Sequence, residues 1–427
     1  MRKYIALLLC VLTGCITNAQ TGIWSGELEV RGNKLPLVFH FDESNPTMDS
    51  PAQGAKGIPI QINKGEGGEI VISVPFALAS FKGKMESDKI VGTFQQNGLS
   101  LPLTLTPGVE KAKRPQTPQG KGPYTEEEVN FKNGDAVLRG TLTMPEGYNR
   151  NTPVVIMVTG SGLQNRDEEI LEHKPFAVIA DALAREGIAT LRYDDRGFGE
   201  STGDVVNCTT EDLMRDALAG IDFLRGRFDR VGVLGHSEGG TIALMLAADG
   251  KADFIVSLAG MVVSGKEALL EQNRRILTES SIPEKTVDDY CRLLSKILDK
   301  DADALQQLES AEIPQALKQN LPVVVRQMQT PYMSYIVALD MRKRLGEIKC
   351  PVLALNGTKD CQVDYEANLK SLRDGLPANS LNRIEAAEGL NHLFQHCTTG
   401  SVMEYGTIEE TISPEILSAI TQWINSL

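Results

Sequence analysis

The sequence predicts an α/β protein, in which a mostly parallel sheet carries helices on both faces and follows a small all-β domain. Three observations predict this organisation. Short alternating apolar runs fill residues 20–108 and are separated by Gly, Asn, Asp and Pro. A segment at 109–124 is rich in Pro, Gly and charge, as domain linkers are. From 125 to 427, runs of strand length alternate with runs of helix length.

Residues 1–19 have the pattern of a secretory signal peptide, because a charged start precedes an apolar core too short to span a bilayer. Two cleavage sites are compatible with this segment. Leu12–Cys15 resembles a lipobox, which would make Cys15 a lipid anchor, and Thr17–Ala19 resembles an ordinary signal peptidase site. Both place the mature protein outside the cytoplasm, in the periplasm or anchored at the cell envelope.

The first domain is predicted to be a small antiparallel barrel or sandwich. Trp24 and Phe94 are expected in its core rather than on a sugar-binding surface. The predicted strands are Gly22–Val30, Leu35–Phe41, Ile58–Ile62, Glu69–Val74 and Lys89–Phe94.

The second domain opens with a predicted hairpin that turns at Asn133-Gly134. Strands and helices then alternate up to a terminal helix. Predicted strands are Pro153–Val158, Ala189–Tyr193, Arg230–Leu234, Phe254–Ala259, Lys349–Asn356 and Leu381–Ile384, and predicted helices are Pro175–Glu186, Thr210–Phe223, Gly240–Ala248 and Ile416–Ile424. A long helical insertion at about 262–346 is expected to form a cap over the site. Within it, Tyr332–Ile336 either lines the substrate pocket or belongs to the core of the cap.

The motif Gly235-His236-Ser237-Glu238-Gly239 follows a predicted buried strand and precedes a predicted helix. The bare motif is weak evidence in a chain with 39 glycines, so its context carries the inference. A strand, a sharp turn and a helix form the nucleophile elbow, which raises a serine hydroxyl above the sheet edge. Ser237 is therefore the candidate nucleophile. His236 points beside it and is expected to pack.

A nucleophilic serine requires a base and a carboxylate that orients the base. Asp360 follows a predicted strand and lies at the edge where open parallel sheets build their sites. His392 lies in the loop after the last predicted strand, and the order Ser237, Asp360, His392 is the nucleophile, acid, histidine order of α/β-hydrolases. Two residues compete with these assignments. His396 fits the loop less well than His392, and Asp364 is expected to begin the next helix.

The predicted strand 153–158 ends in Thr159-Gly160-Ser161-Gly162, where one backbone donor for an oxyanion is expected. Either Ser161 or Gly162 supplies it, with Ser161 preferred, and the N–H of Glu238 supplies the other. The contacts of Asp194-Asp195-Arg196 are expected to be structural rather than catalytic.

Together these motifs resemble the serine α/β-hydrolase superfamily and, within it, bacterial secreted esterases with a small N-terminal β domain. The resemblance covers residues 125–427. It is carried by Gly160–Gly162, Tyr193–Ser201, Gly235–Gly239, Pro351–Asp360 and Gly389–His392. Many such relatives have His-Gly where this chain has Thr159-Gly160. This difference affects the hydrogen bonding of that loop, but a backbone N–H can still serve as the oxyanion donor.

The resemblance implies a secreted hydrolase that cleaves small-molecule or glycan-linked carboxylic esters through an acyl-enzyme. A peptidase or thioesterase on the same fold is the enzymatic alternative. The other alternative is a carbohydrate-binding lipoprotein with an inert hydrolase half. The oligomeric state is not predicted.

Composition argues against some classes of partner and cofactor. A formal net charge of −13, without a long basic run, excludes a broad nucleic-acid surface. No C-x-x-C pair or histidine cluster suits zinc, so neither a metal nor an organic cofactor is expected. Cys361 follows the proposed acid and Cys397 follows the proposed base. They are expected either to form a disulfide or to be separate thiols.

Overall fold

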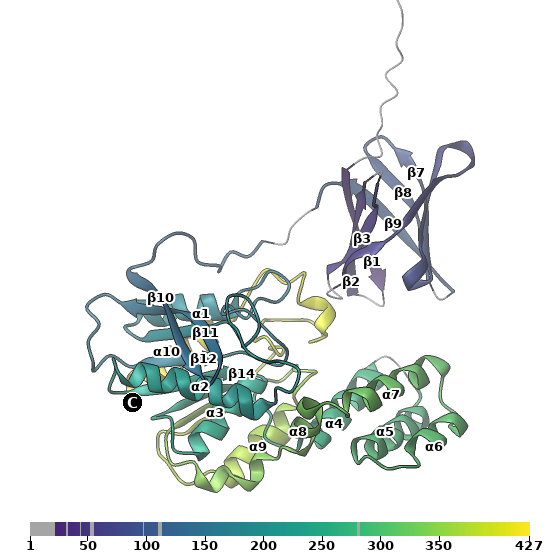
Figure 1. Cartoon of the computed structure of the whole chain (residues 1–427). Helices are drawn as coiled ribbons and strands as arrows, with labels where there is room; N and C mark the ends of the chain where they lie inside the picture. The colour runs from purple at the N-terminus through teal and green to yellow at the C-terminus, as the bar shows by residue number, and fades with distance from the viewer. Residues whose placement is uncertain are drawn as a thin grey trace, which may run out of the picture. The chain divides into compact units, whose positions relative to one another are not determined.

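The chain divides into two compact units in the computed structural model, Met1–Lys111 and Ala112–Leu427 (Figure 1). The structure describes residues 22–30, 33–42, 44–51, 55–96, 98–109, 113–279 and 282–427. The predicted signal segment, with Cys15, lies outside the described residues. The boundary between the units falls within the segment 109–124 that the sequence marks as a linker.

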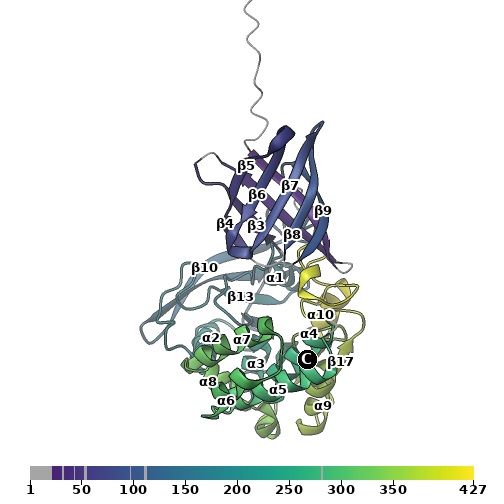
Figure 2. The ribbon, with the colours of Figure 1, turned by 90° about the vertical axis from the view of Figure 1, so that its right-hand side faces the viewer.

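The first unit contains one antiparallel sheet, with nine strands in the described residues (Figure 2). The strand order is β4-β3-β2-β1-β9-β8-β7-β6-β5. Trp24 and Phe94 are buried in its core, as predicted. The strands are β1 Gly22–Val30, β2 Asn33–Phe41, β3 Thr47–Ser50, β4 Ala55–Pro59, β5 Gln61–Lys64, β6 Glu69–Val74, β7 Ala79–Glu86, β8 Lys89–Gln96 and β9 Leu99–Pro107.

Two features of this sheet differ from the prediction. The run Ile58–Ile62, predicted as one strand, is divided between β4 and β5 at Ile60, whose N–H donates to the carbonyl oxygen of Pro46 at 3.1 Å. Pro59 has no N–H with which to continue a ladder, which explains the break. Strands β3, β7 and β9 are missing from the prediction. Polar residues or a glycine interrupt the apolar pattern of β3 and β7, whereas β9 alternates regularly, with leucine at 99, 101, 103 and 105.

The second unit is built on an eight-stranded sheet in the order β10-β11-β13-β12-β14-β15-β16-β17. Strands β10 and β11 form the predicted hairpin, and β11 pairs antiparallel with β13. The remaining neighbours in this order, from β13 through β12 to β17, pair in parallel. These strands are β10 Tyr124–Asn133, β11 Ala136–Pro145, β12 Val154–Val158, β13 Ala189–Tyr193, β14 Val231–His236, β15 Ile255–Leu258, β16 Val352–Gly357 and β17 Arg383–Ala387.

Two boundaries move slightly. The hairpin loop consists of Gly134 and Asp135, because Asn133 still pairs with Ala136, and Gly134 supplies the positive φ of 57° that such a loop requires. The last strand begins at Arg383 rather than Leu381.

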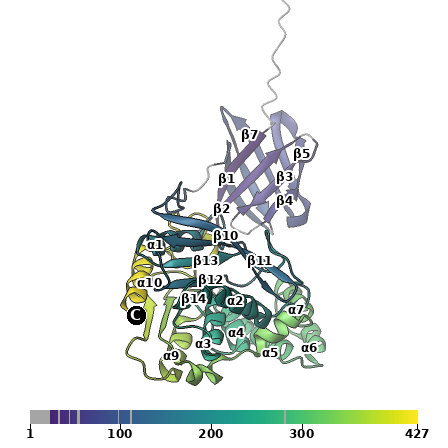
Figure 3. The same ribbon diagram turned by 60° about the vertical axis from the view of Figure 1, so that its left-hand side comes forward.

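Helices cover both faces of this sheet (Figure 3). Along β12, Val155 and Met157 join one apolar core with α1 and α10, and Val154 and Ile156 join the other core with α2, α3 and α9. The period of two along a strand thus explains why this strand is apolar throughout. The helices are α1 Pro175–Arg185, α2 Thr210–Arg225, α3 Glu238–Ala248, α9 Tyr365–Gly375 and α10 Pro414–Ser426.

The insertion between β15 and β16 is helical, as predicted, and has an apolar core of its own. Its helices are α4 Gly265–Glu279, α5 Glu284–Leu298, α6 Ala304–Ser310, α7 Gln315–Gln327 and α8 Pro331–Ala338, followed by the 3-10 turns η4 Met341–Lys343 and η5 Leu345–Glu347. In the part of the chain that the structure describes, no helix has the length and hydropathy needed to cross a bilayer.

Candidate active site

Ser237 lies between β14 and α3 with φ of 54° and ψ of −118°. Such a conformation is strained for a non-glycine residue, and strain of this kind is concentrated at functional sites. The turn requires glycine on both sides. A Cβ on Gly235 would lie 1.9 Å from the carbonyl oxygen of Gly239, and a Cβ on Gly239 would lie 2.0 Å from the carbonyl oxygen of Val158. The sequence motif therefore folds into a sharp elbow that places Ser237 at the carboxyl edge of the sheet.

Asp360 lies after β16 and is completely buried. Its Oδ1 accepts hydrogen bonds from the N–H groups of Gln362 and Val363 at 2.8 and 2.9 Å. Its Oδ2 accepts from the side-chain amide of Asn356 at 2.9 Å and lies 2.7 Å from Nδ1 of His392. Burial raises the pKa of Asp360, but the charge and hydrogen bond of His392 and the backbone donors outweigh it, so that the pKa lies below its ordinary value.

His392 lies after β17 in a loop organised by its neighbour Asn391. The side-chain oxygen of Asn391 accepts from the N–H groups of Leu393 and Gln395, both at 3.0 Å. With Nδ1 directed at Asp360, the ring presents Nε2 as the acceptor for another proton.

The competing residues have other partners. The side chain of Asp364 caps α9 and accepts from the N–H of Ala367 at 2.7 Å, as expected. His396 is exposed, and its Nδ1 lies 2.9 Å from Oε2 of Glu410. The structure thus brings Asp360 and His392 together and leaves Asp364 and His396 outside the pair.

Ser237 and His392 line the same cavity, which has a volume of about 360 Å³. Cap residues Tyr332, Met333 and Ile336 line its other side. Met333 and Ile336 also pack against the core of the cap, so each of the two interpretations left open for this segment holds in part. Among the described residues that line the cavity there is neither a lysine nor an arginine.

The predicted oxyanion donors lie at the elbow and in the loop after β12. Glu238 is the first residue of α3, where backbone N–H groups have no partner within the helix. Ser161 lines the cavity, whereas Gly162 is not one of its lining residues. The N–H of Gly160 donates to Oε1 of Glu168 at 2.7 Å and is not available. This geometry favours Ser161 over Gly162 as the second donor, and both roles stay predictions.

A model of one protein family, described as serine aminopeptidase S33, matches residues 172–396, which is more than half of the chain. The chain belongs to this family. It has the α/β-hydrolase fold.

Two relatives and one solved structure show how far the similarity reaches. The chain is 28% identical to the esterase EstD of Thermotoga maritima over 290 residues, covering 65% of this chain and 64% of EstD. It is 29% identical to the polyketide transferase claH of Penicillium crustosum over 164 residues, covering 36% of this chain and 51% of claH. The chain therefore spans less than two thirds of either relative. The crystal structure of a Mycobacterium smegmatis proline iminopeptidase is 17% identical with a TM-score of 0.45, covering 70% of this chain and 98% of that one.

In this S33-family chain, Thr159 is held by the buried carboxylate of Asp195. Its hydroxyl donates to the carboxylate of Asp195, with oxygen separations of 2.8 and 2.9 Å, and the N–H of Gln164 donates to the same carboxylate at 2.8 Å. Burial raises the pKa of Asp195 to about 7. Asp195 thus holds both ends of the segment 159–164 in place.

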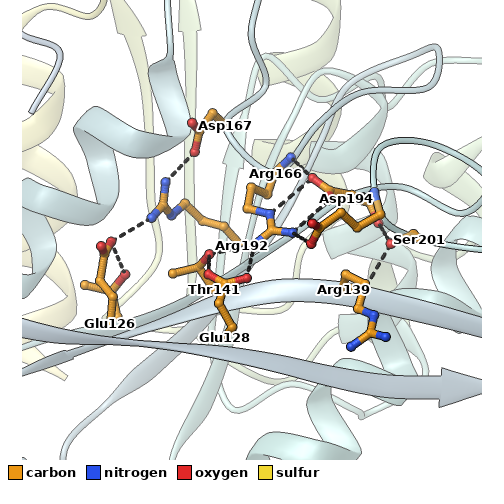
Figure 4. A network of polar contacts seen from close by, with 11 residues as sticks. Glu126, Glu128, Arg139, Thr141, Arg166, Asp167, Arg192, Asp194 and Ser201 are labelled. Atoms are coloured by element: carbon orange, nitrogen blue, oxygen red, sulfur yellow. Dashed lines mark hydrogen bonds and ion pairs between the residues drawn. The ribbon is translucent and has the colours of Figure 1, made fainter.

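Charged pairs hold the next part of this loop to the sheet (Figure 4). The guanidinium of Arg166 donates to Asp194 at 2.8 Å and to Glu128 at 2.6 Å. Asp167 accepts from Arg192. The expectation that Asp194 and Asp195 make structural contacts agrees with this arrangement.

Sequence reasoning missed two polar contacts of the site. Glu168 is buried between the oxyanion loop and His236, although Glu168-Glu169 has the composition of an ordinary surface loop. The hydroxyl of Tyr332 donates to Oε2 of Glu238 at 2.5 Å, which joins the cap to the elbow. The glutamate after the nucleophile was the available signal for the second contact, since a buried carboxylate requires a donor.

Cys361 and Cys397 form no disulfide with each other. The thiol of Cys397 donates to the carbonyl oxygen of Gly389 at 3.5 Å instead. The alternative of separate thiols therefore holds. Within the described ranges, no group of three or more His, Cys, Asp or Glu side chains is arranged to hold a metal ion.

Proposed function

We propose that this protein is a serine hydrolase that cleaves carboxylic esters through an acyl-enzyme on Ser237. The observation that carries the proposal is the 2.7 Å contact between His392 and the buried Asp360, beside a strained serine that lines the same cavity. Ser237 and His392 line this cavity and Asp360 lies behind the imidazole, an arrangement that supports activation of the serine as a nucleophile.

In the proposed reaction His392 takes the hydroxyl proton as the oxygen of Ser237 attacks the ester carbonyl. Asp360 orients the imidazole and stabilises the imidazolium that forms. The N–H groups of Glu238 and Ser161 stabilise the oxyanion, and the loss of one such donor costs about 3 kcal/mol of transition-state stabilisation. His392 returns the proton to the departing alcohol. A water molecule, deprotonated by His392, then releases the acid and restores the serine.

The relatives support an ester rather than an amide as substrate, because the chain is similar to a named esterase over 65% of its length. The family description favours a peptidase as the second candidate. Glycan-linked esters and export across the membrane, with Cys15 as a lipid anchor or cleavage after Ala19, stay proposals that rest on the sequence alone.

A fluorophosphonate probe tests two statements together, that Ser237 is the nucleophile and that the protein is a serine hydrolase. We expect one covalent adduct, located on Ser237 by peptide mass spectrometry, and no adduct in Ser237→Ala. A panel of p-nitrophenyl esters and aminoacyl p-nitroanilides then separates the candidates. Turnover of the anilides alone would favour the peptidase, and an unmodified Ser237 would support the inert lipoprotein.

The charge of the cavity predicts a substrate preference. Glu238 lines the cavity, and among the described lining residues no lysine or arginine pairs with it, so an anionic ester would face like charge there. We expect 4-acetoxybenzamide to be cleaved with a kcat/KM at least about tenfold above that of the isosteric anion 4-acetoxybenzoate, a difference of about 1.4 kcal/mol. Acetate release measures both rates.

Glu238→Gln removes this negative charge and retains the backbone N–H. The preference for the amide over the anion should therefore shrink in this variant. Glu211→Gln, which changes an exposed carboxylate on α2 paired with Arg215, is the matched control and should leave the ratio unchanged. Equal kcat/KM values for the two substrates in wild type would contradict the prediction.

A further inference from the structure

One carboxylate oxygen lies behind the nucleophile and joins three parts of the site. Oε1 of Glu168 accepts from the N–H of Gly160 at 2.7 Å and lies 3.0 Å from Nδ1 of His236. On the other side of the ring, Nε2 of His236 lies 2.9 Å from the backbone carbonyl oxygen of His392. Glu168, His236 and His392 are 3%, 7% and 4% exposed, so water does not compete for these contacts.

The number of protons on His236 follows from its partners. A carbonyl oxygen can only accept a hydrogen bond, so Nε2 of His236 must carry a proton. An ionised carboxylate also only accepts, so Nδ1 carries a proton as well when it faces the ionised Glu168 at 3.0 Å. A histidine ring with both nitrogens protonated is an imidazolium.

We propose that His236 is a buried imidazolium paired with Glu168, and that this ion pair positions the oxyanion loop and the His392 loop against the elbow. Glu168 and His236 are positioning residues, because neither touches the reacting atoms. The catalytic consequence rests on the ester hydrolysis proposed above, whereas the charge state of His236 does not.

The charges around His236 come from several elements and favour its protonation. Glu168 faces it from the loop after β12, Asp360 from the loop after β16 and His392 from the loop after β17, with ring centroids of the two histidines 4.8 Å apart. The charges of Glu168 and Glu238 also reach Asp195, where they add to the effect of burial in raising the pKa. Burial lowers the pKa of His236, but the charge and hydrogen bond of Glu168 outweigh it, and the pKa lies above its ordinary value.

The pair has a mechanical role. Gly160 immediately precedes Ser161, so Glu168 fixes the backbone next to the predicted oxyanion donor. The Nε2 proton of His236 fixes the carbonyl of His392 and with it the base. Glu168 itself has a positive φ of 51°, an unusual conformation for glutamate that directs its carboxylate inward. Hydrogen bonds between charged partners are about twice as strong as neutral ones, so the Glu168–His236 pair holds the two loops more firmly than a neutral contact would.

Nitrogen NMR of the full-length protein with ¹⁵N-labelled histidine rings tests the charge state directly. We expect both ring nitrogens of His236 to be protonated at pH 7, with a titration midpoint above the ordinary value of about 6.5. In Glu168→Gln one of the two ring nitrogens should lose its proton at this pH. Burial lowers the pKa of His236, and the negative charge that offsets this effect is absent from the variant. The matched control is Glu169→Gln, an exposed neighbour that contacts Lys174, and it should leave the spectrum unchanged. A single protonated nitrogen in wild type would place the proton on Glu168 and overturn the proposal.

Kinetics test the positioning role separately. Glu168→Ala should lower kcat for p-nitrophenyl acetate by up to about 100-fold with little change in KM, because small displacements of catalytic groups cost rates of this order. Glu168→Gln retains an acceptor for Gly160 and should fall between Glu168→Ala and wild type. A wild-type kcat in Glu168→Ala would overturn the positioning role. The wild-type NMR titration requires no variant and remains decisive if a variant fails to fold.

Discussion

Replacing Ser237 with alanine is expected to lower kcat for p-nitrophenyl acetate by about a millionfold, leaving only the residual rate that binding and the oxyanion donors provide. Members of a triad act as a unit, so loss of the nucleophile alone removes nearly all of the catalysis. Alanine lacks the oxygen that His392 would deprotonate, and it places no new group in the cavity. A burst assay with purified protein measures the loss.

Two controls make this result specific. Ser418→Ala changes an exposed serine on α10 and should keep the wild-type rate. The Ser237→Ala protein should also unfold at a denaturant midpoint close to that of wild type, because only one half-buried hydroxyl is lost. Equal rates in Ser237→Ala and wild type would refute the triad and favour the inert lipoprotein.

The second large effect is expected for Asp360→Asn, with a loss of about 10⁴-fold in kcat and a normal fold. Asparagine has nearly the same shape as aspartate, but its amide can place an N–H against Nδ1 of His392. The imidazole would then carry its proton on Nε2 and could not accept one from Ser237. Because the pKa of Asp360 lies below its ordinary value, wild type keeps the ionised carboxylate throughout the neutral range.

Asp364→Asn is the matched control for this prediction. Asp364 caps α9, and asparagine is as good a helix cap as aspartate, so both activity and stability should stay near wild type. Steady-state kinetics on the two purified variants decide the assignment. A damaging Asp364→Asn beside a harmless Asp360→Asn would show that the acid has been misassigned.

Much of the α/β unit could be predicted, because its signals are local. Strand β12 is apolar at every position and lies within a residue of its predicted bounds. Helix α5, inside the predicted helical insertion, repeats its apolar residues at the helical period. The elbow is partly local, since Gly235 avoids a collision with the carbonyl oxygen of Gly239 inside the motif, whereas Gly239 avoids one with Val158 on the neighbouring strand β12. The β unit was predicted less completely. Its strands are amphipathic, and residues such as Pro59 alter the pairing without changing the hydrophobic pattern.

The contacts of Glu168 and Tyr332 could not be predicted, because they join residues that lie far apart in the sequence. Glu168 meets His236 across 68 positions of sequence, and Tyr332 meets Glu238 across 94. No periodicity or turn signal links such positions, because their proximity depends on where the loop after β12 and the cap helix α8 settle. Burial of a carboxylate is likewise a property of the folded environment and not of the residue.

The sequence by itself determined the order of strands and helices along the second unit, the elbow at Ser237, and the choice of Asp360 and His392 from their places after strands. These follow from local backbone preferences and from the rule that parallel strands end at one edge. Only the tertiary structure decided that Asp360 lies 2.7 Å from His392, that Asp195 anchors Thr159, and that Glu168 joins three loops. Long-range packing sets those distances, and it alone removes the water that would otherwise weaken each of these contacts.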